Sequence, residues 1–113
     1  VNGNAAILQI LKTKIWFEGY DPVTYTYGED ALEAFRRESP KVIVLDECLP
    51  DMDALTVCRR IRTESAVPII ILAFSISSRK DFWDLGFIDC VSKPFNPQEI
   101  IKRIKEKINV MNL

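Results

Sequence analysis

The stretch KVIVLD, residues 41–46, decides the fold class, because it is a continuous apolar run that ends in a carboxylate. Such a run is typical of a parallel strand that is buried on both of its faces. A second run of this kind, PIIILAF, occupies residues 68–74. We therefore expect these two segments to form adjacent parallel strands at the centre of a sheet, with helices covering both sides.

The flanking segments alternate between helical and strand patterns. Helices are predicted at residues 5–18, 29–38, 53–64, 78–85 and 97–110, and further strands at residues 22–26 and 89–92. Asn4 can cap the first helix, and Gly19 lies where a glycine commonly ends one. Strict alternation predicts one α/β domain over residues 1–113, a doubly wound three-layer α/β/α sandwich with a parallel sheet.

The composition excludes several classes of protein. A chain of 113 residues is long enough to bury one hydrophobic core. Its net charge of −1 is too small to attract the whole molecule to nucleic acid or to an anionic membrane. The longest apolar run is too short to span a bilayer, and no signal peptide pattern opens the chain. The last helix carries four basic residues, Lys102, Arg103, Lys105 and Lys107. Because Glu99 and Glu106 lie among them, we expect these side chains to form an ordinary solvent-exposed face of the helix. We expect a cytoplasmic protein.

The cysteines, Cys48, Cys58 and Cys90, are odd in number and widely spaced, and the chain has no histidine. This argues against a disulfide framework, a zinc site and histidine-based catalysis, and it favours a reducing compartment. Redox sensing by Cys48 or Cys90 stays open as an alternative. A buried cysteine, however, more often serves as a small apolar side chain.

Two charged residues are predicted to meet at the carboxyl edge of the sheet, where reactive groups collect in such folds. Asp46 ends one strand, and Lys93 directly follows the last one. The carboxylate could act as a nucleophile toward a phosphoryl group, and the lysine could neutralise the phosphoryl oxygens. A structural ion pair is the alternative reading of the same two residues.

The motifs LDECLPDMDAL (residues 45–55), VCRRIR, PIIILAF and SKPFNPQEIIKRIKEKI together resemble the receiver domains of bacterial response regulators. The similarity runs from Asn2 to about Ile108, and it is closest to the branch that usually carries a winged-helix DNA-binding domain. It implies a flavodoxin-like fold, a role in two-component phosphorelay signalling without enzymatic activity, and a sensor histidine kinase or small phosphodonor as partner. Contact with nucleic acid would need an output domain outside residues 1–113. The resemblance makes Asp46 the phospho-acceptor and Lys93 a phosphoryl contact.

The metal site departs from the family pattern. In the family, Mg²⁺ is held by an acidic pair after the first strand, by the phospho-acceptor and by a backbone carbonyl, here that of Cys48. The acidic pair falls at Asn2 and Gly3, and neither is a carboxylate. Mg²⁺ prefers carboxylate oxygens, and each unit charge lost at about 4 Å removes on the order of 4 kcal/mol of attraction at an effective dielectric near 20. We expect Mg²⁺ binding to be weak or lost.

The switch positions are altered as well. In the family, a residue with a hydroxyl group contacts the phosphoryl group, and here that position is Ala73. The family's next residue is small, and here it is Phe74. The family's mobile aromatic side chain is replaced by Cys90, and the glycine of a turn is replaced by Ala54. Together these changes predict a receiver that has been released from phosphorylation. Its output would be protein–protein binding, with Asp46 a weak acceptor or a relic.

A homodimer face is implied by the same resemblance, because Asp89, Glu99 and Arg103 match family positions that pair across a twofold axis. Ordinary surface charges are the alternative. A flavodoxin-like cofactor binder is a further alternative, although the four residues before the first helix offer one glycine and no Ser/Thr cluster.

Only Val1 remains of the family's first strand, so we expect either a clipped or engineered start, or a neighbouring strand in its place. In the latter case residues 22–26 would pair directly with residues 41–46, or a strand would come from another copy.

Overall fold

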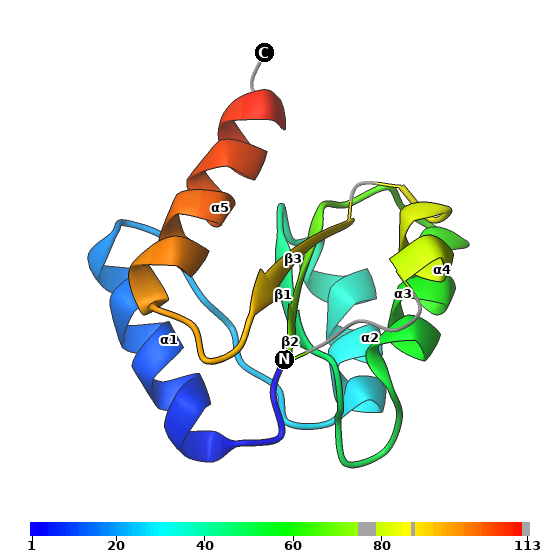
Figure 1. Ribbon diagram of the computed structural model, residues 1–113, viewed down its shortest axis with the longest axis horizontal. Helices are drawn as coiled ribbons and strands as arrows, with labels where there is room; N and C mark the ends of the chain where they lie inside the picture. The colour runs from blue at the N-terminus through cyan, green and yellow to red at the C-terminus, as the bar shows by residue number, and fades with distance from the viewer. Residues whose placement is uncertain (75–78, 87, 112–113) are drawn as a thin grey trace.

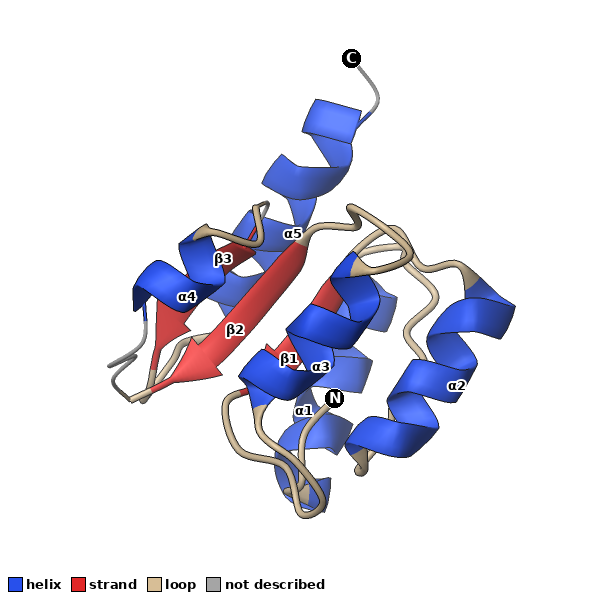
Figure 2. Cartoon of the chain, turned by 90° about the vertical axis from the view of Figure 1, so that its right-hand side faces the viewer, coloured by secondary structure: helices blue, strands red, loops and turns tan. Residues whose placement is uncertain are grey.

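The computed structural model describes residues 1–74, 79–86 and 88–111. Three layers are visible in Figures 1 and 2: α1 and α5 cover one face of the sheet, and α2, α3 and α4 cover the other. The elements in chain order are α1 (Ala5–Phe17), α2 (Gly28–Glu38), β1 (Ile43–Asp46), α3 (Ala54–Arg62), β2 (Ile69–Ala73), α4 (Arg79–Trp83), β3 (Ile88–Ser92) and α5 (Pro97–Met111). The doubly wound α/β architecture predicted from the sequence is confirmed.

The described strands form one parallel sheet in the order β1-β2-β3. Leu45 of β1 is level with Ile71 of β2, which is level with Cys90 of β3. The expectation that residues 41–46 and 68–74 form adjacent parallel strands is confirmed. β2 is the middle strand of the described sheet, whereas β1 lies at its edge.

The continuous apolar sequence of β2 is explained by its two buried faces. Successive side chains of a strand point to opposite faces, so Ile69 and Ile71 pack among α2, α3 and α4, while Ile70 and Leu72 pack against α1 and α5. All of these side chains are at most 1% exposed. The helices therefore hold the sheet between two separate apolar clusters.

The helix ends follow the capping signals. Asn4 Oδ1 accepts hydrogen bonds from the backbone N–H groups of Ala6 and Ile7, and Asp53 caps α3 through the N–H of Thr56. Gly19 has φ +92°, in the left-handed region that ends many helices. The predicted helix at residues 78–85 corresponds to α4, and its predicted first residue, Ser78, lies outside the described residues. None of the helices described is both long and apolar enough to cross a membrane.

The prediction of a strand at residues 22–26 was wrong, because these residues form no strand in the structure. The Val1–Asn2 segment lies between these residues and β1: Val1 N donates to Val44 O (2.6 Å), Asp46 N donates to Val1 O (2.9 Å), and Asn2 N donates to Tyr25 O (3.1 Å). Direct pairing of residues 22–26 with β1 is therefore also not observed. The reason is that a strand needs a ladder partner along its length, and this segment has only two residues beside it.

Candidate functional site

The carboxyl ends of the three strands come together at one edge of the sheet. Asp46 ends β1, Ala73 ends β2, and Lys93 directly follows β3. The ladders continue past the strands, because Glu47 N donates to Leu72 O (3.0 Å) and Lys93 N donates to Ala73 O (2.9 Å). The middle strand thus holds the backbone of Lys93 and of Glu47, the residue after Asp46, whereas Asp46 N itself donates to Val1 O.

Asp46 and Lys93 form a direct ion pair, as one of the two interpretations of the sequence predicted. Lys93 Nζ contacts Asp46 Oδ1, and the two side chains are only 16% and 8% exposed. Among the described residues Oδ1 has no hydrogen-bond partner besides this contact, and Oδ2 accepts a long bond from Cys48 N (3.4 Å). To reach Asp46, Lys93 crosses the end of β2, which lies between β1 and β3 in the sheet. The carboxylate charge is neutralised by a side chain from two strands away.

Asn2 lies beside Asp46. Val1 is bonded to Val44 and Asp46 and is therefore level with Leu45, which places the next residue, Asn2, level with Asp46. Asn2 is 3% exposed, and its Oδ1 accepts a hydrogen bond from Asn4 N (2.8 Å). Its Nδ2 has no partner within the described part of the chain. The side-chain oxygen of Asn2 is thus already hydrogen-bonded, and the group of its amide that remains unpaired, the NH₂, is a hydrogen-bond donor.

The remaining candidate metal ligands do not complete a carboxylate cluster. Gly3 is exposed and supplies no side chain, and Cys48 is exposed with its N–H on Asp46. Within residues 1–74, 79–86 and 88–111, no group of three or more His, Cys, Asp or Glu side chains could hold a metal ion. Of the four positions that the resemblance assigned to the metal, only Asp46 carries a charge.

Phe74 and Glu47 add contacts to the edge of this site. Lys93 Nζ lies 5.4 Å from the centroid of the Phe74 ring, within the range of a cation–π interaction. Phe74 N donates to Glu47 Oε1 (3.2 Å), so Glu47 links the segment after β1 to the end of β2. The sequence interpretation missed Glu47, and the only signal for it was a second carboxylate next to Asp46.

The two switch positions lie in the strands themselves, with Ala73 buried in β2 and Cys90 half-buried in β3.

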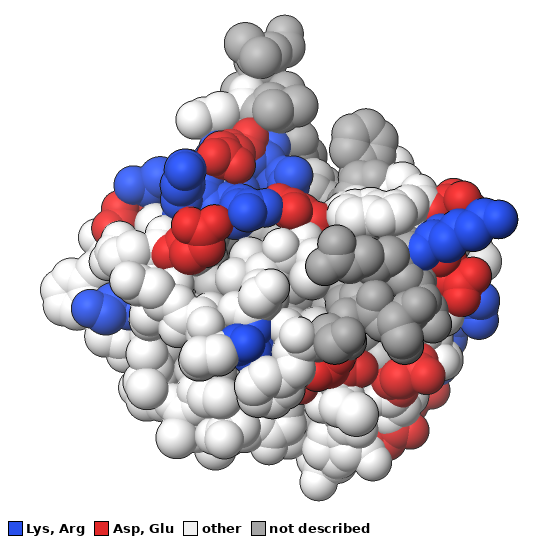
Figure 3. All heavy atoms as spheres, in the orientation of Figure 1, with Lys and Arg blue, Asp and Glu red and all other residues white. Residues whose placement is uncertain are grey.

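The charged residues assigned to a dimer face meet within one molecule. Arg103 Nη1 contacts Asp89 Oδ2 (2.6 Å), and Arg103 Nε contacts Glu99 Oε1 (3.0 Å). Lys107 Nζ lies 3.4 Å from the same Asp89 oxygen. Burial raises the pKa of Asp89, but the hydrogen bonds from Arg103 and from its own neighbouring backbone, together with the charge of Lys107, outweigh it and hold the pKa below its usual range. Figure 3 shows lysine and arginine mixed with acidic side chains over α5, as predicted.

Comparisons with known proteins agree with the fold. Residues 1–105 match the response regulator receiver domain family. The chain is 40% identical over 107 residues to the "probable transcriptional regulator ycf27" of Porphyridium aerugineum, covering 93% of this chain and 45% of that protein. It is 32% identical over 114 residues to the DNA-binding response regulator MtrA of Mycolicibacterium paratuberculosis, covering 96% of this chain and 49% of that protein.

Solved structures show the same topology. The receiver domain of the Francisella response regulator 1452 superimposes with a TM-score of 0.88 at 26% identity, over 97% of this chain and 93% of that one. The chain spans about half the length of the two relatives named above. These comparisons give no support to a cofactor-binding flavodoxin-like protein or to a redox sensor.

Proposed function

The chain belongs to the response regulator receiver domain family, and on that premise we propose that it is a receiver with a weakened Mg²⁺ site, whose output is protein–protein binding. Receivers of two-component systems generally bind Mg²⁺ at an acidic pocket and take their phosphoryl group from a histidine kinase or a small phosphodonor. In this chain Asp46 is the candidate acceptor, and Lys93 and Ala73 are the candidate phosphoryl-contacting residues. We assign the whole of residues 1–113 to this one domain and its action to the cytoplasm, without enzymatic activity of its own.

The observation that carries the proposal is the direct contact between Lys93 and Asp46 beside an uncharged Asn2. Mg²⁺ is a hard cation that is usually held by one or two carboxylates in an octahedron of oxygens. Here Asp46 is the one carboxylate among the candidate ligands, and an ammonium group already contacts it. The amide group of Asn2 that has no partner is a donor, which repels a cation instead of binding it. The residues present do not fit Mg²⁺ well.

Loss of the switch residues supports the second half of the proposal. A phosphoryl group shifts a conformational equilibrium only if it interacts differently with the two states. Ala73 has no hydroxyl to bond that group, and Cys90 stands in place of a large aromatic. Phosphorylated Asp46 would therefore change the rest of the domain little. The relatives named as transcriptional or DNA-binding regulators suggest that any contact with DNA is made by an output domain outside residues 1–113.

The test is labelling of Asp46 by acetyl phosphate, followed by mass spectrometry with and without Mg²⁺. We expect slow labelling that Mg²⁺ accelerates little, because phosphoryl transfer depends on positioning and on electrostatic stabilisation, largely by the metal. Asn2→Asp and Asn2→Asp/Gly3→Asp should restore an Mg²⁺-dependent rate. Fast Mg²⁺-dependent labelling of the unchanged protein would overturn the proposal.

Two controls make the labelling result specific. Asp46→Asn should abolish the label, which identifies the modified side chain. Gly3→Ala separates charge from crowding, since a Cβ at Gly3 would lie 3.2 Å from Pro50 Cδ. If Gly3→Ala altered labelling as much as the double acidic variant, the rescue could not be assigned to metal ligation.

A further inference from the structure

Asn2 and Gly3 form the one Asn-Gly pair in the sequence. In such a pair the backbone nitrogen of glycine can attack the side-chain amide carbon of asparagine, because glycine has no Cβ to hinder the approach. Deamidation by this route makes asparagine one of the thermolabile residues of proteins. The residues that follow the other asparagines all carry side chains: Ala5, Pro97, Val110 and Leu113. The sequence thus singles out Asn2 for this reaction.

The side-chain amide of Asn2 is folded over the peptide bond to Gly3. Its Oδ1 accepts a hydrogen bond from Asn4 N (2.8 Å), two residues further on, so the side chain spans the intervening peptide as in an Asx turn. This arrangement brings Asn2 Cγ toward Gly3 N. A donor at this distance also stabilises the negative charge that develops on Oδ1 when the amide carbon is attacked.

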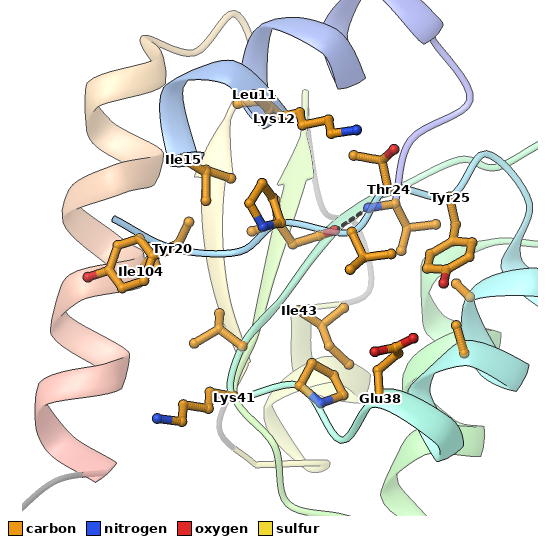
Figure 4. Close-up of a pocket in the computed structure, with 18 of the residues that line it drawn as sticks. Leu11, Lys12, Ile15, Tyr20, Thr24, Tyr25, Glu38, Lys41, Ile43 and Ile104 are labelled. Atoms are coloured by element: carbon orange, nitrogen blue, oxygen red, sulfur yellow. Dashed lines mark hydrogen bonds between the residues drawn. The ribbon is translucent and has the colours of Figure 1, made fainter. Parts of the chain in front are cut away.

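The other two groups in the reaction are free of hydrogen bonds. Asn2 Nδ2, the leaving group, has no partner among the described residues. Gly3 is exposed to solvent, and its N–H donates no hydrogen bond within residues 1–74, 79–86 and 88–111. The backbone of Asn2 is held, because its N–H donates to the carbonyl of Tyr25 (3.1 Å), which lies on the wall of the cavity drawn in Figure 4. Attack therefore breaks no hydrogen bond of the nucleophile or of the leaving group.

We propose that Asn2 is a modification site, which deamidates through attack by Gly3 N and thereby supplies a second carboxylate beside Asp46. Solvent takes the proton of the Gly3 N–H, and the nitrogen bonds to Asn2 Cγ. The Cγ–Nδ2 bond then breaks, and the nitrogen leaves as ammonia after taking a proton from solvent, so that a cyclic imide remains. Water that adds at Cγ breaks the new bond and leaves an aspartate at position 2. The whole conversion consumes one water and releases one ammonia, with no oxidant or reductant.

The new carboxylate would change the charge of the site. Asn2 is level with Asp46 and only 3% exposed, so two carboxylates would lie close together and largely buried. Lys93, which contacts Asp46, is a single ammonium group for both. Neighbouring like charges disfavour the ionised state of each other unless a cation compensates them. Deamidation would thus turn a poor Mg²⁺ site into a better one, and this consequence rests on the proposed function.

The experiment follows the folded protein during incubation in mildly alkaline buffer. Peptide mass spectrometry should find conversion at Asn2 before any other asparagine, and anion-exchange chromatography should resolve a more acidic form. Gly3→Ala should slow the conversion at least ~10-fold, because a Cβ hinders the nucleophile and raises the barrier. Asn2→Gln should show no conversion at position 2 on the same time scale, since its ring would be one atom larger. An Asn2 that stays intact in the folded protein, or a Gly3→Ala variant that reacts as fast as the unchanged chain, would refute the proposal.

The purified acidic form is then compared with Asn2→Asp by measuring Tm as Mg²⁺ is added. We expect the two proteins to respond alike. If neither gains stability from Mg²⁺, the proposed account of the metal site fails, while the modification stands on the mass spectra. If Asn2→Asp responds and the acidic form does not, the imide has opened at the main-chain carbonyl to give isoaspartate, and the inferred second carboxylate is wrong.

Discussion

Lys93 contacts the carboxylate of Asp46 directly, by reaching over the end of the middle strand β2. The two charges belong to segments 47 positions apart in the sequence that the β1-β2-β3 order brings to one edge. Since both side chains are largely buried, each depends on the other for compensation of its charge. The same contact competes with any cation at Asp46.

Removing the lysine should be strongly destabilising. Lys93→Met leaves a buried, uncompensated carboxylate, and breaking a buried pair in this way costs about 3–5 kcal/mol. The free energy of unfolding in urea measures the loss. Lys93→Met/Asp46→Asn should recover a large part of it, since no charge is then buried. A single variant as stable as the unchanged protein would mean that Asp46 is well solvated without Lys93.

Protonation of the Asp89 carboxylate should lower the free energy of unfolding in acid. Its pKa lies below the usual range, because the Arg103 hydrogen bond and its other partners outweigh the effect of burial. The charged form therefore stabilises the fold above the unfolded pKa, and this stability is lost as the pH falls through the folded value. An NMR titration should show a lowered Asp89 pKa that rises in Arg103→Gln. Lys105→Gln, which removes the contact with Glu18 instead, should leave it unchanged.

Self-association through the face formed by Asp89, Glu99 and Arg103 stays a prediction. Because Arg103 already bonds both carboxylates within one molecule, a dimer must share or exchange these contacts, and we expect it to be weak. Arg103→Glu should weaken it, as measured by sedimentation equilibrium over a concentration series, while Lys105→Glu should have a smaller effect. A monomer at every concentration, or a dimer indifferent to Arg103→Glu, would contradict the prediction.

The cysteines should differ sharply in reactivity. Cys58 is fully buried, and burial raises the pKa of its thiol to about 12, so almost no thiolate is present at pH 8. Cys48 is exposed. Timed alkylation with iodoacetamide and mass spectrometry should modify Cys48 first and leave Cys58 intact until the protein is unfolded in urea. Rapid modification of Cys58 in the native protein would show that the core cluster around it opens easily.

Local sequence was sufficient for the layers and for the place of the site. Residues 68–74 have no polar position, and a segment of that length can be apolar throughout only if both of its faces are covered, as β2 is. Asp46 and Lys93 could be paired in advance because parallel strands present their carboxyl ends at one edge. These predictions depend on periodicity and topology, which a single chain carries in its residue order.

Other features were decided only by tertiary structure. Residues 22–26 have a β-rich sequence, yet no strand forms there, because strand formation depends on a neighbour at the right spacing and only Val1–Asn2 is beside them. The ion pairs are a second case: the family resemblance assigned Asp89, Glu99 and Arg103 to a dimer face, which stays a prediction, and only the packed chain shows that α5 brings Arg103 onto Asp89 and Glu99 within one molecule. Residue order indicates which segments can form helices or strands, but whether a strand forms, and which hydrogen bonds and ion pairs join distant segments, depends on distances that only the packed chain sets.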